Sequence, residues 1–372
     1  MKITHIETIP VLIPIKARLI IHSSQGIHAS SPFLLVKIHT DAGIVGLGEA
    51  SCTPLWSGED HVTAAHMIQR YLSPSLIGKD PRDIEALSRQ MDTLLPGNLF
   101  TKSALEMACW DILGKATGLP LYRLLGGAVR ERIPLKFSLS GAEPARAAEL
   151  AIWAVSQGFQ AVKVKVGTTP AEDMARVGAV REAIGPEIRL GVDANGGWSV
   201  PDAIRTIRAL EAQNLFFVEQ PVSAADPIWM AEVRAKVSVP LIADESVFNL
   251  AQALSVARLR AADVFSVYVG KGGGIGGARK MAAVAEAAGL CCTVGSNLEL
   301  GIASAAMIHL AIATPGIGAE MFPCDIIGPF YYEADLLTEP LPLSGGVARP
   351  IERPGLGVEL DEEKVARFTL PG

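Results

Sequence analysis

The chain has 372 residues, of which 49% are hydrophobic and 19% charged, and its formal net charge is −6. This length favours two structural units, and the mild charge with dispersed basic residues argues against nucleic-acid and membrane-surface binding. No apolar run approaches the roughly 18 residues of a spanning helix. The five cysteines form no CxxC pair, which is typical of a reduced cytoplasmic enzyme.

The N-terminal third has the pattern of an α+β unit. The segment MKITHIETIPVLIPI alternates polar and apolar residues, so we expect a first strand there and not a signal peptide. SPFLLVKIHT and GIVGLGEA flank the turn Asp41-Ala42-Gly43, which predicts a hairpin. Apolar residues then recur at helical spacing from about residue 60 to the Gly126-Gly127 break. These elements predict a capping unit over residues 1–128.

From Ile133 onwards, apolar strand-like runs alternate with amphipathic helices. The runs are IPLKFSL, AVKVKVG, IRLGVDA, LFFVEQP, PLIADES, DVFSVYVG, LCCTVGS and GAEMF. About eight strands over roughly 190 residues predict a parallel βα barrel over residues 129–327. The tail, residues 328–372, contains several prolines and lacks this rhythm, and we expect it to return to the first unit.

Three acidic residues follow strand-like runs about one βα unit apart. They are Asp193 in VDANGGW, Glu219 in FFVEQP and Asp244 in LIADES. In a barrel, this spacing returns the chain to the same rim, one strand further round. Such a cluster of carboxylates requires a cation, and an all-oxygen set favours Mg²⁺ or Mn²⁺. The pattern predicts a metal-dependent enzyme.

Lysines surround this predicted acid cluster. Lys163 and Lys165 share one face of the strand VKVKV, and a lysine desolvated beside a second cation can act as a base near neutral pH. The alternative is a strand whose lysines face water. Lys271 begins KGGGIGG beyond Asp244 and is expected across the barrel, although this glycine-rich run is also compatible with a weak anion-binding loop.

Several polar residues near the strand ends are further candidates for the site. Asn195 should share the face of Asp193, unless it only forms the turn before Gly196, whereas Glu245 should point away from its neighbour Asp244. Glu320 and Glu299 are candidates for contacting Lys271 or the substrate. None of the seven histidines lies between about residues 67 and 308, which argues against a histidine base, a zinc site or a Ser-His-Asp triad on this rim.

The ordered motifs KVKVG, DANGGW, VEQP, ADES and KGGG resemble the muconate-lactonizing subgroup of the enolase superfamily. The resemblance spans the whole chain and includes GNLFTKSALEMACWDILGK, LLTEPL and PGLGVELDEEKV. It implies an α/β fold: a modified (β/α)7β TIM barrel with an N-terminal α+β capping domain. It also implies a cytoplasmic homo-oligomer, with an octamer as one form, that acts on a small-molecule carboxylate.

The resemblance assigns roles to the acids and lysines. Asp193, Glu219 and Asp244 would be ligands of Mg²⁺ or Mn²⁺, Lys165 the acid–base catalyst, Lys163 its tuning partner and Lys271 the lysine on the opposite face. The shared chemistry is proton transfer α to a carboxylate, with the metal stabilising an enolate-like intermediate. Substrate choice would come from capping loops at about residues 20–31 and 51–58. The candidate substrate contacts are His22, Gln25, Thr53, Trp56, Asn195, Asn297, Glu299 and Glu320.

Cyclisation of cis,cis-muconate to muconolactone is the reaction that these similarities favour, but departures in GAEMFPCDIIGPF leave the substrate open. A dipeptide epimerase expects Asp-x-Asp where this chain has Pro323-Cys324-Asp325. An N-acylamino acid racemase or o-succinylbenzoate synthase would need a more apolar pocket. A dehydratase of the mandelate racemase type would need a barrel histidine, and a non-catalytic binding protein would be expected to lose an acid or lysine.

Overall fold

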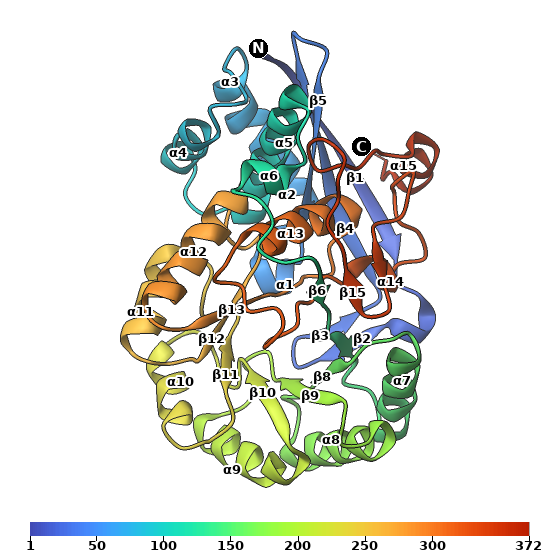
Figure 1. Cartoon of the computed structure of the whole chain (residues 1–372), viewed down its shortest axis with the longest axis vertical. Coiled ribbons are helices and arrows are strands. Elements are labelled where there is room, and N and C mark those ends of the chain that lie inside the picture. The colour runs from blue at the N-terminus through green and yellow to red at the C-terminus, as the bar shows by residue number, and fades with distance from the viewer. Residues whose placement is uncertain (372) are drawn as a thin grey trace.

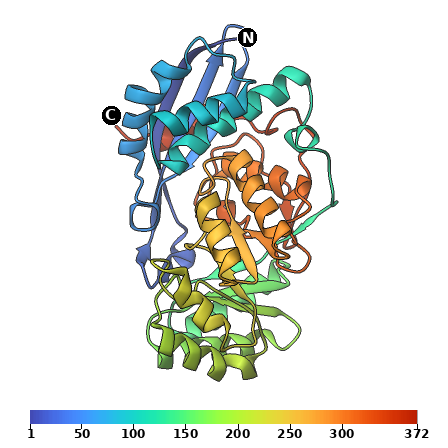
Figure 2. The ribbon, with the colours of Figure 1, turned by 90° about the vertical axis from the view of Figure 1, so that its left-hand side faces the viewer.

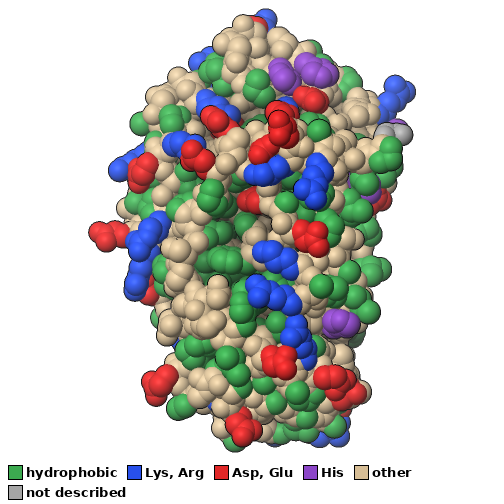
Figure 3. All heavy atoms as spheres, turned by 90° about the vertical axis from the view of Figure 1, so that its right-hand side faces the viewer, with side chains coloured by type: hydrophobic (Ala, Val, Ile, Leu, Met, Phe, Trp, Pro, Cys, Tyr) green, Lys and Arg blue, Asp and Glu red, His purple; other side chains and the backbone are tan. Residues whose placement is uncertain are grey.

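The computed structural model describes residues 1–371. Figure 1 shows an upper unit built from the N-terminal elements and a lower unit in which helices surround a curved sheet. Acidic and basic side chains are interspersed over the face drawn in Figure 3. No helix within residues 1–371 combines the length and the apolar character needed to cross a membrane.

The upper unit is built on three antiparallel strands in the order β1-β4-β5. They are β1 (Ile3–Pro14), β4 (Ser30–Thr40) and β5 (Val45–Ser51), which confirms the expected first strand and hairpin. Between β1 and β4 lie a 3₁₀ turn (Ala17–Leu19) and a short hairpin of β2 (Ile21–Ser23) and β3 (Gly26–His28). This hairpin extends down to the lower unit in Figure 2.

Helices follow the strands of this sheet in the chain. They are α1 (Pro54–Ser57), α2 (His61–Met67), a π-helical turn (Ile68–Leu72), α3 (Ser73–Leu76), α4 (Ile84–Leu94), α5 (Leu99–Thr117) and α6 (Leu121–Leu124). The long helix α5 lies directly against β5. A Cβ atom on Gly48 would lie 1.9 Å from the carbonyl oxygen of Ala104, so glycine allows this close approach.

The lower unit contains seven parallel strands that neighbour one another in chain order. The strands are β7 (Phe137–Leu139), β8 (Ala161–Lys165), β9 (Arg189–Asp193), β10 (Leu215–Glu219), β11 (Leu241–Ala243), β12 (Val264–Val267) and β13 (Cys291–Val294). The helices are α7 (Pro144–Ser156), α8 (Pro170–Ile184), α9 (Val200–Leu210) with a 3₁₀ turn (Glu211–Gln213), α10 (Pro227–Arg234), α11 (Leu250–Arg258), α12 (Ile275–Ala287) and α13 (Gly301–Ala313). Helices bury the outer face of each strand and the side chains inside the barrel bury the inner face, which explains the continuous apolar runs.

The first and last expected barrel strands were placed incorrectly. Ile133–Pro134 (β6) pairs with β15 (Val347–Ala348) of the C-terminal tail, and only the end of IPLKFSL enters the barrel as β7. GAEMF forms no strand; isolated parallel bridges of Cys292 with Ile317 and of Leu135 with Cys324 lie there instead. Pro323 lacks the N–H that a continuous ladder needs, so the barrel is closed by bridges.

The C-terminal tail contacts both units, because β15 pairs with β6 ahead of the barrel and other tail residues bridge to the upper unit. Its elements are α14 (Gly328–Tyr331), β14 (Leu343–Ser344), β15 (Val347–Ala348) and α15 (Glu362–Phe368). Tail residues Tyr332 and Thr369 form isolated bridges to the strand β1 region. These contacts place the end of the chain beside strand β1, as Figure 1 shows.

Two buried glutamates of the upper unit join it to the barrel. Glu49 on β5 accepts backbone N–H bonds of 2.8 and 3.0 Å at the start of α13. Glu106 on α5 accepts two of 2.9 Å at the start of α12. Helix N-termini attract carboxylates, so these contacts hold the units together. Because Glu106 occupies the N-terminus of α12, the KGGGIGG run does not form the anion-binding loop considered as an alternative.

Candidate active site

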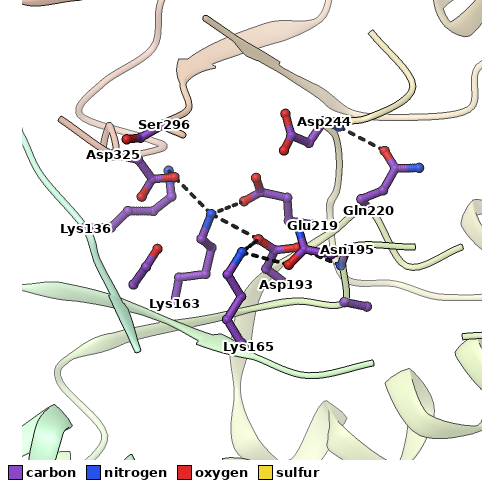
Figure 4. Close-up of polar contacts among 12 residues, drawn as sticks. Lys136, Lys163, Lys165, Asp193, Asn195, Glu219, Gln220, Asp244, Ser296 and Asp325 are labelled. Atoms are coloured by element: carbon purple, nitrogen blue, oxygen red, sulfur yellow. Dashed lines mark hydrogen bonds and ion pairs between the residues drawn. The ribbon is translucent and has the colours of Figure 1, made fainter. Parts of the chain in front are cut away.

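The three spaced acids lie at neighbouring strand ends. Asp193 ends β9, Glu219 ends β10 and Asp244 directly follows β11. Asp193 and Glu219 are paired in register, as are Asp193 and Lys165 of β8. The parallel register therefore brings the acids and the lysine pair to one end of the barrel (Figure 4).

Lys163 and Lys165 both point at these acids, which excludes a strand whose lysines face water. Lys163 Nζ lies 3.0 Å from Glu219 Oε2, 3.3 Å from Asp193 Oδ2 and 3.0 Å from an oxygen of Asp325. Lys165 Nζ lies 2.7 Å from Asp193 Oδ2 and 2.8 Å from Asn195 Oδ1. Lys163 is buried and Lys165 is half-buried on the wall of a cavity, so the outer lysine is the one that a substrate would meet.

Burial and opposing charges set the ionisation of this cluster. Burial alone would lower the pKa of Lys163, but Asp325, Glu219 and Asp193 raise it well above its ordinary value. Burial likewise disfavours ionised Asp193, but Lys165 and Lys163 lower its pKa to about 2. Burial, together with the neighbouring acids, raises the pKa of Glu219 to about 8. Lys163 is therefore a permanent cation among acids that repel one another.

The acids fit a hard divalent cation. Among residues 1–371, Glu219 Oε1 is buried without a hydrogen-bond partner, and the set offers only oxygen ligands, as Mg²⁺ prefers. No three His, Cys, Asp or Glu side chains of the described chain have a ready-made metal-ligating arrangement. Each of the three acids contacts a lysine amine. These amines compensate the negative charge of the acids, which a bound cation would otherwise balance.

Lys271 flanks the acid row on the side opposite to Lys165. Its Nζ donates to Asp244 Oδ1 at 2.6 Å, to the Asp244 carbonyl at 2.8 Å and to the Ser266 carbonyl at 2.7 Å. The side chain is fully buried. The strand order β8 to β12 therefore places one lysine at each end of the row of three acids.

A cavity of about 260 Å³ adjoins the acids and extends to the upper unit. Of the candidate substrate contacts, Gln25, Thr53, Trp56, Asn195 and Asn297 line it. Asn195 has a positive φ of 44°, so it forms the turn after β9 and also contacts Lys165. Asn195 therefore serves both as the turn residue before Gly196 and as a residue of the site.

Three other candidate contacts lie elsewhere. His22 is exposed on the hairpin, where its backbone bonds to Ser140 and Gly141. Glu299 is buried and accepts bonds from Ser296 and Asn297, so it supports the cavity wall from behind.

Glu320 is exposed and pairs with Arg132 at 3.4 Å. Its backbone carbonyl accepts a bond from Arg189, the first residue of β9. Glu320 therefore lies near the opposite end of the barrel, because the strand that was expected to carry it to the site does not form.

Glu245 was expected to point away from the site, and this was wrong. Strand β11 ends at Ala243, and Gln220 Oε1 accepts the backbone N–H groups of Asp244 and Ser246 at 3.0 and 3.1 Å. The chain turns here, so the two-residue alternation of a strand no longer applies. Glu245 Oε1 instead accepts a 2.9 Å bond from Asn195 Nδ2.

Lys136, Asp325 and His28 were missed. Lys136 Nζ lies 3.2 Å from Asp325 Oδ2, which also bonds to Lys163. The lysine within the apolar run IPLKFSL was a signal comparable to that of VKVKV. His28 lines the cavity, and its pKa is lowered by burial and by the charge of Lys165. No sequence signal separated His28 from His22.

Comparisons with known proteins agree with this architecture. The family model for the mandelate racemase / muconate lactonizing enzyme N-terminal domain matches residues 6–126, and the enolase C-terminal domain-like model matches residues 145–364. The N-succinyl-L-Arg/Lys racemase of Bacillus cereus is 36% identical over 100% of this chain and 98% of its own length. Its crystal structure superposes with a TM-score of 0.95, covering 100% of this chain and 99% of that one at 35% identity.

Two further solved structures are similar to this chain. The muconate lactonizing enzyme from Pseudomonas fluorescens, complexed with muconolactone, has a TM-score of 0.95 at 31% identity and covers 99% of each chain. The dipeptide epimerase from Enterococcus faecalis V583, complexed with Mg and the dipeptide L-Leu-L-Tyr, has a TM-score of 0.91 at 32% identity, with 96% of this chain and 100% of that one covered. The chain therefore belongs to the mandelate racemase and muconate lactonizing enzyme family of the enolase superfamily, and is an enzyme of its racemase, epimerase and cycloisomerase type.

Proposed function

We propose that the protein transfers a proton at the carbon next to a substrate carboxylate, with Lys165 as the acid–base group. The observation that carries this proposal is the position of Lys165: its amine lies 2.7 Å from Asp193, and its side chain lines the cavity. Lys163 behind it is enclosed by three acids. An accessible base at the cavity wall, backed by a buried cation, suits removal of a weakly acidic proton.

Asp193, Glu219 and Asp244 are the residues that would hold Mg²⁺ or Mn²⁺. When bound, such a cation supplies positive charge that stabilises the negative charge left on the carboxylate as its α proton departs. Asn195 Oδ1 orients the Lys165 amine, and Lys163 contributes a second positive charge within the acid cluster.

We propose racemisation of an N-acylated amino acid as the specific reaction. Racemisation needs a proton-transfer group on each face of the α carbon, and Lys165 and Lys271 flank the acid row. A free substrate ammonium group would find Asp325 already bonded to Lys136 and Lys163, which favours an acylated amine. The outer wall carries Ile27, Pro54 and other neutral residues and no arginine, which favours a neutral, largely apolar substrate tail.

Cycloisomerisation of cis,cis-muconate to muconolactone, the reaction favoured by the sequence, is the second candidate. One observation supports it: Lys271 makes three hydrogen bonds to protein oxygens, and the lysines on the cavity wall are Lys163 and Lys165. A reaction that needs a single acid–base lysine fits this arrangement.

Lysine variants incubated in D2O with Mg²⁺ distinguish the two candidates. Single enantiomers of N-acylamino acids are supplied and loss of the α-proton signal is followed by NMR. For a racemase, Lys165→Ala loses exchange from one enantiomer and Lys271→Ala loses it from the other. For a cycloisomerase, muconate is consumed, and this activity is lost in Lys165→Ala and retained in Lys271→Ala.

The exposed-lysine variant Lys280→Ala is the control, since Lys280 lies on α12 and pairs with Glu85 at the surface. It should retain the wild-type rate with every substrate. If neither N-acylamino acids nor muconate reacts with the wild-type enzyme and Mg²⁺, both specific proposals fail.

A further inference from the structure

One carboxylate oxygen beside the cavity contacts three separate parts of the chain. Glu245 Oε1 accepts hydrogen bonds from Asn195 Nδ2 at 2.9 Å, Trp56 Nε1 at 3.1 Å and Gln25 Nε2 at 3.4 Å. Gln25 belongs to the hairpin segment, residues 21–28, and Trp56 to the α1 segment, residues 53–57. Asn195 follows barrel strand β9. Glu245 therefore connects both capping segments to the barrel through side-chain bonds to one acceptor oxygen.

The α1 segment is also held by aromatic packing. The Trp56 ring stacks on Tyr268 at 5.4 Å between centroids and contacts Phe248 at 5.0 Å. The Tyr268 hydroxyl in turn donates to Asp244 Oδ2 at 2.9 Å. Indole packing and the N–H bond to Glu245 thus fix the same side chain against the barrel rim.

The tips of both capping segments carry apolar side chains that line the cavity and are exposed. Ile27 is 69% exposed and Leu55 is 81% exposed. Exposed apolar side chains at a cavity wall gain from contact with a bound ligand. The position of these tips over the cavity depends on the segments that Glu245 holds.

Glu245 also determines the orientation of the Asn195 amide. A carboxylate only accepts hydrogen bonds and an ammonium group only donates them. Asn195 can therefore bond to both Glu245 and Lys165 in one orientation only, with Nδ2 toward Glu245 and Oδ1 toward Lys165 at 2.8 Å. Without Glu245, the amide is free to turn its NH₂ group toward the Lys165 amine, where it would repel it.

We propose that Glu245 is a positioning residue that fastens the hairpin and α1 segments onto the barrel and, through Asn195, orients Lys165. The position of the capping segments over the cavity and the orientation of the Lys165 amine are then coupled through one side chain. The part that concerns Lys165 rests on the proposed function, whereas the fastening of the segments does not.

Limited proteolysis tests the fastening independently of activity. Chymotrypsin cleavage after Leu55 and Trp56 is timed by mass spectrometry for the wild type, Glu245→Ala and Glu245→Gln. Cleavage of a locally opened segment follows the population of the open form. We expect about tenfold faster cleavage in Glu245→Ala and near wild-type cleavage in Glu245→Gln, because glutamine keeps the acceptor oxygen and the size.

Asn195→Ala separates the two parts of the proposal. It removes one donor to Glu245 and the only amide between Glu245 and Lys165, while Trp56 and Gln25 remain bonded. We expect near wild-type cleavage after Leu55, with kcat reduced about a hundredfold by misplacement of the lysine. Glu245→Ala should both raise KM and lower kcat, and Glu245→Gln should restore most of both.

Equal cleavage of Glu245→Ala and the wild type would overturn the fastening role, and an unchanged kcat in Asn195→Ala would overturn the link to Lys165. If Glu245→Ala does not fold, Trp56→Phe keeps an aromatic ring at this position but removes the indole N–H, and unchanged cleavage after Leu55 would count against the proposal. If the wild type has no α-proton transfer activity, the proposed function fails, while the cleavage rates still decide whether Glu245 holds the segments.

Discussion

Replacing Lys163 by methionine should destabilise the cation-free protein because three buried acids would lose their shared counter-charge. The Lys163 amine lies 3.0 Å from Glu219, 3.0 Å from Asp325 and 3.3 Å from Asp193. Methionine preserves most of the side-chain volume and removes the charge. Removing one partner from a buried ion pair costs about 3–5 kcal/mol, so we take about 4 kcal/mol as the expected loss.

This loss corresponds to a measurable shift in melting temperature. At about 2.1 cal/mol/K per residue, the unfolding entropy of 372 residues is about 0.8 kcal/mol/K, so the expected decrease in Tm is about 5 °C. The assay is calorimetry in EDTA. Lys280→Met is the matched control: its pair with Glu85 is exposed, and exposed pairs contribute at most about 1 kcal/mol. A Tm for Lys163→Met within about 1 °C of wild type would show that the three acids do not depend on the Lys163 charge.

Three further outcomes follow from individual residues. Asp244→Asn should weaken Mg²⁺ binding at least about tenfold by calorimetric titration; an unchanged titration would contradict its role as a ligand. His309 is buried, and burial lowers its pKa to about 4. Below about pH 6.5, the unfolded chain therefore binds a proton on this histidine that the folded chain does not bind. Unfolding free energy should therefore fall by roughly 3 kcal/mol between pH 6.5 and 4, and His309→Gln should lose this part of the slope in urea titrations. Gly48→Ala would force its Cβ against the Ala104 carbonyl, and we expect a loss of about 1–3 kcal/mol in denaturant melts; an unchanged midpoint would count against tight α5 packing.

The parts of the fold that follow from regular periodicity could be predicted from the sequence. Strand and helix patterns repeat at a fixed interval, so the ends of β9, β10 and β11 and the acid at each could be located from the motif spacing alone. The alternation in VKVKV likewise placed both lysines on one face. These features depend on local geometry, which the sequence expresses directly.

Features that depend on contacts between distant segments could not be predicted in this way. Glu245 turns toward the site because Gln220, from the preceding βα unit, takes up the backbone N–H groups that would have extended β11. Asp325 forms an ion pair with Lys136, although the two residues are 189 positions apart in the chain. His28 lines the cavity and His22 does not because of the way the hairpin lies against the barrel.

The central claim is that Lys165 moves the α proton of a bound carboxylate. The most direct measurement is α-proton exchange in D2O, with Mg²⁺ present, for single enantiomers of N-acylamino acids, comparing the wild type with Lys165→Ala. We predict exchange by the wild type and its loss from one enantiomer in Lys165→Ala, whose Mg²⁺ titration, and whose Tm with Mg²⁺ bound in place of the lost ammonium charge, stay close to wild type. Exchange from both enantiomers at the wild-type rate in that variant would contradict it.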